Sequence, residues 1–260
     1  MPNLIEIKNL TKSLKIQNGF SKILIKELSL SIPSSDKGNI YSVVAPFSSG
    51  KTTLFKIISG LENYDSGEIK FAHSISKIKP FIPENYSTLP WLTVEENIKL
   101  WSKYNPTRFS EEKFDELIED VGLTNYENYH PQSLNSGFQF RIALGRAISF
   151  YPDLILIDDS FKELDSETRI EIYNLLKKVV GKYNFQVILA TTNIIEAIYL
   201  SNKIFLMSKN PAQIISELIN DNDFDDFKTM LTSERFKEIS QKIQSEFQKN
   251  SEISLMHFSV

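Results

Sequence analysis

The chain has 260 residues and a formal net charge of −4 at pH 7, with 41% hydrophobic and 24% charged residues. This length suits one large α/β domain or a domain with an inserted subdomain, and the charge argues against a broad nucleic-acid surface. There is no cysteine, which excludes disulfides and thiolate metal sites. Because no stretch approaches the roughly 20 apolar residues of a membrane span, we expect a cytoplasmic protein with no nucleic-acid partner that meets a membrane only through other subunits.

The first part of the chain has the pattern of two alternating strands followed by a strand–loop–helix unit. Apolar and polar side chains alternate over 4–7 and 28–32, and NIYSVVA at 39–45 is the short apolar run of a buried strand. A loop follows, and Gly60 stands where the next helix would end. The apolar residues before and around that glycine fall at helical spacing: Leu54, Ile57, Ile58 and Leu61.

The loop between that strand and helix carries the clearest chemistry. Residues 49–53 have the sequence SGKTT, the end of the phosphate-binding pattern G-x-x-x-x-G-K-[ST]. Gly50 lets the backbone approach a phosphate, Lys51 can reach the β- and γ-phosphates, and the Thr52 hydroxyl can ligate Mg²⁺. Ala45 stands at the first glycine position, which costs little if its φ stays negative. The alternative to a phosphate-binding loop at this position is an ordinary serine-rich turn before a helix.

A second element, about a hundred residues downstream, favours the phosphate-binding interpretation. The segment PDLILIDDS at 152–160 is an apolar strand that ends in Asp158, where an aspartate can hold Mg²⁺ through water. A strand that ends in a solvated acidic turn would have the same pattern. The loop and the strand together are more specific than either alone, and they predict an ATP and Mg²⁺ site.

Between them the sequence becomes mainly helical, and strand patterns return after it. Segments 93–104 and 109–123 have helical patterns with acidic first turns, and strands are predicted at 185–192 and 203–207. Beyond residue 220 we expect two amphipathic helices that pack on the core in preference to docking a partner. Their apolar positions are Phe224, Phe227, Leu231, Phe236, Ile239, Ile243 and Phe247.

The segment LNSGFQFRIALGRAI at 134–148 resembles the signature segment of ABC-type ATPases, usually L-S-G-G-Q and then a helix with the pattern R-[VI]-A-[LI]-A-R-A. KELD at 162–165 resembles the D-loop of that family, and DSGEIKF at 65–71 fits the strand after the phosphate-loop helix. PWLTVEENI at 90–98 and NPAQII at 210–215 resemble the nitrate/sulfonate/taurine branch of bacterial importers. The resemblance covers nearly the whole chain in the family's order and spacing.

The resemblance implies an α/β P-loop NTPase fold, with a RecA-like core, an antiparallel β subdomain and an α-helical subdomain inserted at about 77–150. The ATP-binding domain would span residues 1–220, and a C-terminal helical extension 221–260. Two such domains would close head to tail on ATP, pairing one chain's phosphate loop with the other's signature segment, and would drive membrane permease subunits. The implied nucleotide-binding residues are Ala45, Ser48, Ser49, Gly50, Lys51, Thr52, Thr53, Asn135, Ser136, Gly137 and Asp165.

Three departures from the family pattern fall on catalytic positions. Asp159 replaces the glutamate that polarises the attacking water, and a misplacement of about 1 Å can cost on the order of a hundredfold in rate. Thr192 replaces the switch histidine, and its hydroxyl is shorter than an imidazole and cannot become a cation. Glu84 replaces the Q-loop glutamine; its carboxylate could ligate Mg²⁺ or serve as a replacement base, but it adds negative charge beside a phosphate.

Further departures fall on the binding surfaces. Asn135 and Ser136 replace the serine and first glycine of the signature, and Ser48 stands where a further glycine is common in the loop. The aromatic residue that usually stacks on adenine aligns near Leu14, with Phe20 a possible substitute. Taken together, the departures support nucleotide binding more strongly than rapid hydrolysis.

The leading hypothesis is an energy-coupling ATPase subunit of a membrane transporter. The second is a nucleotide-gated structural or regulatory subunit that hydrolyses ATP slowly or not at all. A soluble ABC-type protein of DNA repair or translation is disfavoured, because 260 residues hold no long coiled-coil insertion and no second cassette. In a head-to-tail dimer each chain gives its phosphate loop to one site and its signature segment to the other, and in this chain both depart from the family pattern. A partner with intact motifs would therefore leave no site with a complete set of regular motifs. We accordingly expect a homodimer in preference to a heterodimer.

Overall fold

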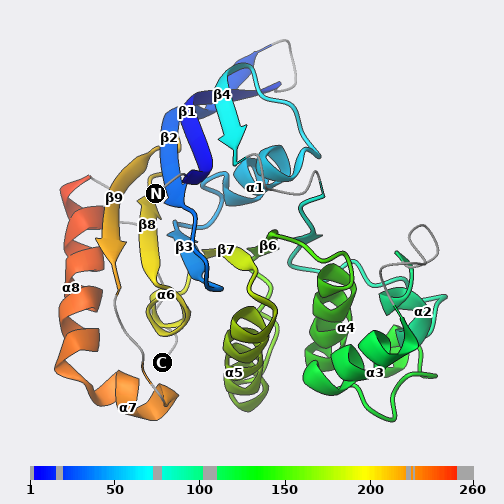
Figure 1. The fold of residues 1–260 in the computed structure, drawn as a ribbon. Helices are drawn as coiled ribbons and strands as arrows, with labels where there is room; N and C mark the ends of the chain where they lie inside the picture. Colours follow the sequence, from blue (N-terminus) through cyan, green and yellow to red (C-terminus); the bar gives the residue numbers. More distant parts are fainter. Residues whose placement is uncertain are drawn as a thin grey trace.

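The computed structural model describes residues 3–15, 20–72, 78–101, 110–220, 224 and 226–250. A three-stranded antiparallel sheet forms one end of the molecule (Figure 1), with the strand order β2-β1-β4. Its alternating apolar residues point inward, so that Ile7 and Leu30 are almost fully buried, which confirms the two strands predicted near the N-terminus. The strands are β1 (Asn3–Lys15), β2 (Ser21–Pro33) and β4 (Ser66–Phe71).

A six-stranded sheet with the order β5-β6-β7-β3-β8-β9 forms the centre of the fold. Its neighbours are parallel except for β9, which runs antiparallel to β8. The inner strands are buried on both faces, which explains their continuous apolar runs. The short strand β5 and the edge strand β9 were not predicted. The strands are β3 (Ile40–Val44), β5 (Phe81–Ile82), β6 (Leu154–Asp158), β7 (Gln186–Thr191), β8 (Lys203–Met207) and β9 (Ile214–Ile219).

This sheet separates two hydrophobic cores. Side chains alternate along β6, so Leu154 and Leu156 join the core shared with helix α1 (Lys51–Ser59) and the three-stranded sheet. Ile155 and Ile157 point to the opposite face and join the core built with the remaining helices. Because the carboxyl ends of the parallel strands meet at one edge, residues from distant parts of the sequence come together there.

Helix α1 (Lys51–Ser59) follows β3 and packs between the two sheets (Figure 1). Gly60 ends the helix as predicted, with a left-handed φ of 83°. Leu61 was wrongly counted in the buried stripe: it lies beyond the C-cap and is 68% exposed, because the chain turns away at Gly60.

Helices α2 (Val94–Ile98), α3 (Glu111–Asp120) and α4 (Ser136–Ile148) gather on one side of the molecule (Figure 1). Thr93 begins α2 with a capping box to Glu96, and Ser110 caps α3. The helix α2 is shorter than the predicted 93–104, and residues 102–104 lie outside the described part of the chain. A 3₁₀ turn at Pro131–Ser133 leads into α4.

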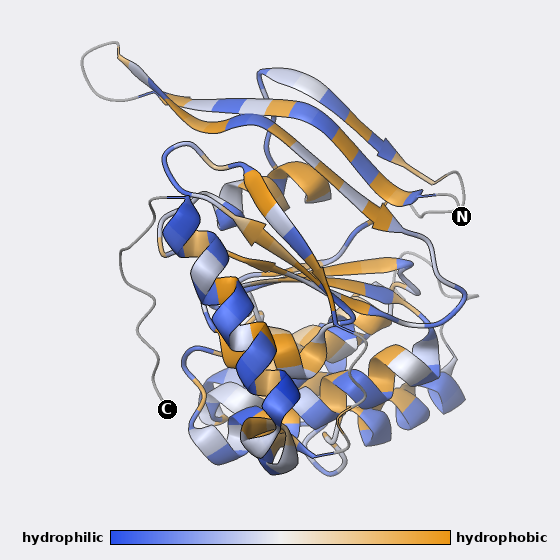
Figure 2. Ribbon diagram, turned by 90° about the vertical axis from the view of Figure 1, so that its left-hand side faces the viewer, coloured by the Kyte–Doolittle hydropathy of each residue, from blue (hydrophilic) through white to orange (hydrophobic). Residues whose placement is uncertain are grey.

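The remaining helices are α5 (Ser166–Tyr183), α6 (Ile194–Leu200), α7 (Phe227–Thr232) and α8 (Glu234–Lys249). Figure 2 shows the amphipathic character of α8, whose Ile243 and Phe247 are buried in the core. Leu231 is 37% exposed, and its neighbour Met230 occupies the buried position instead. Within the described ranges no helix has the length and hydropathy to cross a bilayer.

Candidate nucleotide-binding site

The loop from β3 to α1 has the backbone geometry of a phosphate-binding loop. Ser48 and Gly50 both have left-handed backbones, with φ of 59° and 99°. Such a φ strains serine but suits glycine. Ala45 is fully buried, is not among the residues with positive φ, and donates its N–H to the Thr191 carbonyl at 3.2 Å. The methyl group at this position therefore meets no backbone strain.

The first turn of α1 is open toward a ligand. Gly50 is its N-cap and makes no side-chain capping hydrogen bond. The amides of a helix N-terminus have no intrahelical partners, and together with the helix dipole they attract anions. Leu24 lies directly over Gly50, where a Cβ atom would be only 3.1 Å from its Cγ. The φ of Gly50 favours glycine here, and a Cβ would also make a tight contact with the Leu24 side chain.

Lys51 lies in the first turn of α1 and is only 4% exposed. Its Nζ donates to the carbonyls of Ala45 at 3.2 Å and Pro46 at 3.4 Å, and lies 3.3 Å from Asp159 Oδ2. The ammonium is thus held over the loop by oxygen atoms of Ala45, Pro46 and Asp159.

Asp158 ends β6 beneath the loop and is 3% exposed. Burial raises its pKa to about 6, opposed by a hydrogen bond with the Thr52 side chain and reinforced by the nearby charge of Asp159. Its Oδ1 atom is buried without a hydrogen-bond partner. A buried carboxylate oxygen of this kind needs a cation or donor beside it, so the residues present fit a metal ion next to Thr52.

Asp159 has a left-handed φ of 46°, and hydrogen bonds and an ion pair hold its backbone and side chain in place. Its N–H donates to the Ala190 carbonyl at 2.9 Å, and its Oδ1 accepts the backbone N–H of Thr192 at 3.1 Å. Since Oδ2 pairs with Lys51, both carboxylate oxygens have partners. The structure therefore brings Asp159 and Thr192 together, through the Thr192 backbone.

A cavity of about 380 Å³ opens over the loop. This volume is within the range of small-molecule sites. Glu84 is part of its wall and pairs with Lys162 at 3.2 Å. Asp158 and Thr192 lie just behind the wall, through their contacts with Thr52 and Asp159. The cavity is lined by Leu14, Leu24, Phe47, Ser48, Ser49, Gly50, Lys51, Thr52, Thr53, Glu84 and Asp159.

The signature segment does not reach this cavity. Asn135 caps α4 by accepting the Phe138 N–H at 3.1 Å, and Ser136 is the first residue of that helix. A Cβ on Gly137 would lie 2.5 Å from the Thr168 side chain, so packing against α5 requires glycine there. Asp165 caps α5, and hydrogen bonds from the amides of that cap lower its pKa. None of Asn135, Ser136, Gly137 and Asp165 is part of the cavity wall.

Sequence reasoning missed a buried carboxyl behind the site. Glu196 in α6 is 4% exposed and accepts the Tyr173 hydroxyl at 2.8 Å. Burial raises its pKa to about 7, against hydrogen bonds with Thr191 and Tyr173 that lower it. The available signal was one acidic residue in the otherwise apolar run IIEAIYL. Leu24 and Phe47 in the cavity wall were also missed: Leu24 lies outside every motif, and Phe47 occupies a variable position of the phosphate-loop pattern.

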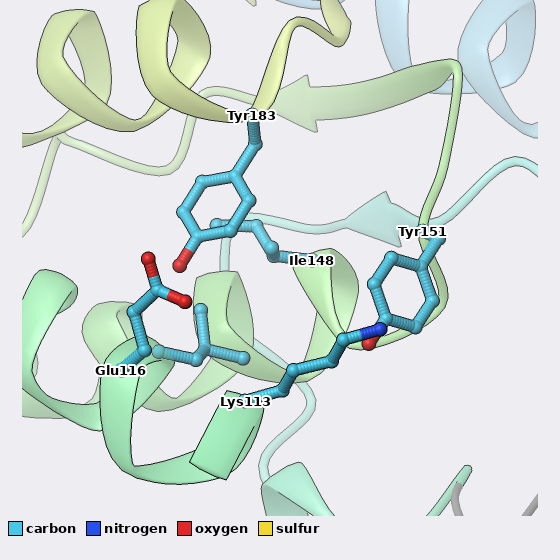
Figure 3. Close-up of a pocket in the computed structure, with 6 residues that line it drawn as sticks. Lys113, Glu116, Ile148, Tyr151 and Tyr183 are labelled. Carbon is cyan, nitrogen blue, oxygen red and sulfur yellow. The ribbon is translucent and has the colours of Figure 1, made fainter. Parts of the chain in front are cut away.

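A second, smaller cavity of about 110 Å³ lies among α3, α4 and α5 (Figure 3). The Tyr183 hydroxyl donates to Asp120 at 2.8 Å beside it, and the Lys113 ammonium lies 5.2 Å from the centre of the Tyr151 ring. It is too small for a nucleotide. Its lining residues are Lys113, Glu116, Leu117, Ile148, Tyr151 and Tyr183.

The strand–loop–helix site on a parallel sheet, joined to the antiparallel sheet, defines a P-loop NTPase fold. Residues 25–162 match the family described as ABC transporter. The chain belongs to the ABC transporter family, as one of its ATP-binding domains.

Curated relatives agree with this assignment. The aliphatic sulfonates import ATP-binding protein SsuB of Bacillus cereus is 34% identical over 218 residues, covering 82% of this chain and 85% of its own length. The SsuB proteins of Bacillus licheniformis and Bacillus subtilis are each 30% identical, and the alignments cover 94% and 92% of both chains respectively.

Solved structures show the same fold. The dimeric structure of MJ0796, described as a bacterial ABC transporter cassette, is 25% identical with a TM-score of 0.69, covering 85% of this chain and all of that one. A dimeric post-hydrolysis state of MJ0796 bound to ADP and Pi has a TM-score of 0.68 at the same identity and coverage.

Proposed function

We propose that this chain is the ATP-binding subunit of an ABC importer, and that it couples ATP binding and slow hydrolysis to solute transport. The observation that carries the proposal is the cavity over the uncapped N-terminus of α1, with Lys51 and the unpartnered Asp158 Oδ1 at its base. The relatives named for aliphatic sulfonate import support an importer of that type. Its partners would be membrane permease subunits, which would hold it on the cytoplasmic face of the membrane.

The proposed cofactors are ATP and Mg²⁺. The amides from Ser48 to Thr53 and the Lys51 ammonium would hold the phosphates. Thr52, Asp158 and Glu84 would hold Mg²⁺, which when bound offsets phosphate charge. In the described part of the chain no group of three or more acidic, histidine or cysteine side chains is arranged to hold a metal by itself. Phosphate oxygens would therefore have to complete the metal site.

Slow hydrolysis is the finer part of the proposal. Asp159 would orient the attacking water, but its short side chain is held back by the Thr192 N–H and by Lys51. The Thr192 hydroxyl would donate one hydrogen bond to the γ-phosphate, where an imidazole would reach further. Glu84 would be an alternative base only after leaving Lys162. If turnover is absent, the same site supports the second function, a nucleotide-gated regulatory subunit.

The proposed assembly is a head-to-tail homodimer of the ATP-binding domain, residues 1–220, with the helical subdomain at 77–150 carrying the signature segment. The separation of Asn135, Ser136, Gly137 and Asp165 from the chain's own cavity supports a site completed by a second copy. The two dimeric structures of the MJ0796 cassette support a dimer as well. The extension from 221 would pack on its own domain.

Measurements on the reconstituted transporter and on the free chain test this function. ATP hydrolysis is measured with the chain bound to its cognate permease subunits in lipid vesicles, and light scattering gives the oligomer of the free chain with hydrolysis blocked. We expect turnover well below about 10 per second and a dimer that forms with ATP. A complete lack of ATP binding, measured by isothermal titration of the unmutated chain, would exclude the proposal. A monomer that dimerises only with a different cassette would exclude the homodimer.

A further inference from the structure

We propose that Glu196 is a positioning residue of the site: through the Thr191 side chain it holds the turn from β7 to α6, and that turn holds the carboxylate of Asp159. The inference rests on the proposed function, because it gives Glu196 a part in placing the group that would orient the attacking water. Glu196 is not among the residues that line the cavity, so it would act only through its neighbours.

The turn after β7 is where backbone hydrogen bonds give way to side-chain ones. The Thr191 carbonyl still accepts the Ala45 N–H at 3.2 Å. The Thr192 N–H donates to Asp159 Oδ1 at 3.1 Å. The Asn193 N–H donates to Thr191 Oγ1 at 2.8 Å. Because the bond between Thr191 and Asn193 spans Thr192, it restrains the backbone that carries the Thr192 N–H.

Glu196 reaches back to this turn from the first turn of α6. Its carboxyl forms a hydrogen bond with the Thr191 side chain and accepts the Tyr173 hydroxyl at 2.8 Å. A hydroxyl group has one proton to donate and two lone pairs that accept. When Thr191 donates its proton to the Glu196 carboxylate, a lone pair of the same oxygen is left for the Asn193 N–H. The carboxylate thus orients the Thr191 hydroxyl in the way that the turn needs.

Tyr173 fixes the other side of the carboxyl from a packed aromatic cluster. It is 1% exposed, and its ring centre lies 5.3 Å from that of Phe161 and 6.0 Å from that of Phe227. Phe161 follows Asp159 by two residues, so the segment that carries the aspartate packs on the same tyrosine. Glu196 is therefore held in place relative to the segment on which it would act.

The burial of Glu196 argues for a role that an apolar residue could not fill. The side chain is 4% exposed, and burial raises its pKa to about 7. The charged groups beside it are Asp159, which raises the pKa further, and Arg169 of α5, which lowers it. A carboxyl in the core costs stability that a leucine of similar size would not cost. Carboxyls with such raised pKa values gather at functional sites, and the contacts of this one lead to Asp159.

The test uses matched variants of the full chain at pH 8, where a carboxyl with a pKa of about 7 is mostly ionised. Glu196→Gln keeps the size of the side chain but can no longer accept hydrogen bonds at both of its terminal atoms. Thr191→Val removes the hydroxyl with little change of shape, and Thr191→Ser keeps it. Glu238→Gln, at an exposed position of α8, is the control.

Amide hydrogen exchange, followed by NMR on the free chain, measures the turn directly. We expect the Thr192 and Asn193 amides to exchange about tenfold faster in Glu196→Gln and in Thr191→Val, because each change loosens the turn. The amides of β7 should keep their protection in both variants. Thr191→Ser and Glu238→Gln should exchange at the rates of the unmutated chain.

Phosphate release over a range of ATP concentrations measures the consequence for hydrolysis. Glu196→Gln and Thr191→Val should each lower kcat about tenfold and change KM by less than about twofold, because a displaced Asp159 weakens only the transition state. The double variant should lose about as much as either single one, since both act through the same hydrogen bond. Isothermal titration should give an unchanged affinity for the β,γ-imido analogue of ATP.

Each contrary result has a distinct meaning. An unchanged exchange rate of the Thr192 amide in Glu196→Gln would overturn the inference, whatever the rate of hydrolysis. Equal losses of kcat and of affinity for the ATP analogue would also overturn it, because they would indicate a general loosening of the fold. If the unmutated chain binds no ATP, the proposed function fails, and the exchange rates alone then decide whether Glu196 holds the turn.

Discussion

The N-termini of α1 and α4 are the two helix ends at which we propose that the dimer holds a nucleotide, and they are built differently. The helix α1 begins at Gly50 with no side-chain cap, under a cavity of about 380 Å³. The N-cap of α4 is Asn135, whose own side chain accepts the Phe138 N–H. The N-terminal amides of α1 are therefore available to a ligand, whereas one N-terminal amide of α4 is already hydrogen-bonded to its own N-cap side chain.

The two regions also differ in how they bury charge. Behind the phosphate loop, Lys51, Asp158 and Glu196 are each less than 5% exposed. Asn135 and the capping Asp165 are themselves exposed. Buried charges are costly unless a partner completes them, so they mark a region organised around a ligand. The exposed Asn135 and Asp165 lie where we propose that a second copy of the chain docks. The following predictions test this difference, in order of decreasing effect.

Lys51→Ala should lower ATP affinity at least a hundredfold, because it removes the only cation that lies over the loop in the described cavity wall. Isothermal titration measures the loss. Lys56→Ala, on the exposed side of the same helix, is the matched control and should bind ATP normally. Equal affinity in the two variants would show that the α1 region does not hold the phosphates.

Glu196 should make the folded protein less stable as pH rises. Its pKa is raised from 4.5 to about 7 by burial, so its stabilising contribution is complete below pH 4.5 and is lost as pH rises through 7. The difference corresponds to on the order of 3 kcal/mol. Urea unfolding at pH 5 and pH 8 should show Glu196→Gln with a smaller decrease than the unmutated protein.

The control for this pH effect is Glu234→Gln, which alters an exposed glutamate in the first turn of α8. It should leave the pH dependence unchanged. If Glu196→Gln and Glu234→Gln give the same pH profile, the charge of Glu196 is not buried in solution and the contrast between the two regions weakens.

Asp159→Glu combined with Thr192→His should raise ATP hydrolysis about tenfold, and by more than the product of the single changes. The longer carboxylate would reach past the present contacts of Asp159 with Lys51 and the Thr192 N–H. The effects of groups that act on the same transition state are not additive, so the double change should exceed the combined single changes. Phosphate release at saturating ATP measures the rate. Asp159→Asn is the control and should lower it. An unmutated protein that already turns over about 10 times per second would contradict attenuation.

Asn135→Ala should lower the free energy of unfolding by about 1 kcal/mol, because α4 loses its N-cap hydrogen bond. Gln132→Ala, three residues earlier and also exposed, should have almost no effect. Urea unfolding measures both. A neutral Asn135→Ala would show that α4 does not depend on its own cap, and that its amides are as available as those of α1.

The strands, the phosphate loop and its fold class could be predicted from the sequence because their signals are local. The run from 39 to 45 and the alternation at 28–32 fix strands over a few residues, and Gly50 and Gly60 mark positions whose φ favours glycine. The strand β5 was missed because its two residues are too few to form a recognisable pattern. The strand β9 was missed because the segment at 210–215, which includes its first residues, was interpreted only as a family motif.

The site's finer arrangement was decided by tertiary structure. The sequence named Asp159 and Thr192 as separate departures, but only β6 lying beside β7 brings the Thr192 N–H to the Asp159 carboxylate. Leu24 enters the cavity because the antiparallel sheet folds over Gly50. Glu196 has a raised pKa because helices from distant segments exclude water around it. Contacts of this kind depend on how segments pack in space, and a linear pattern holds no information on the distance between side chains that are far apart along the chain.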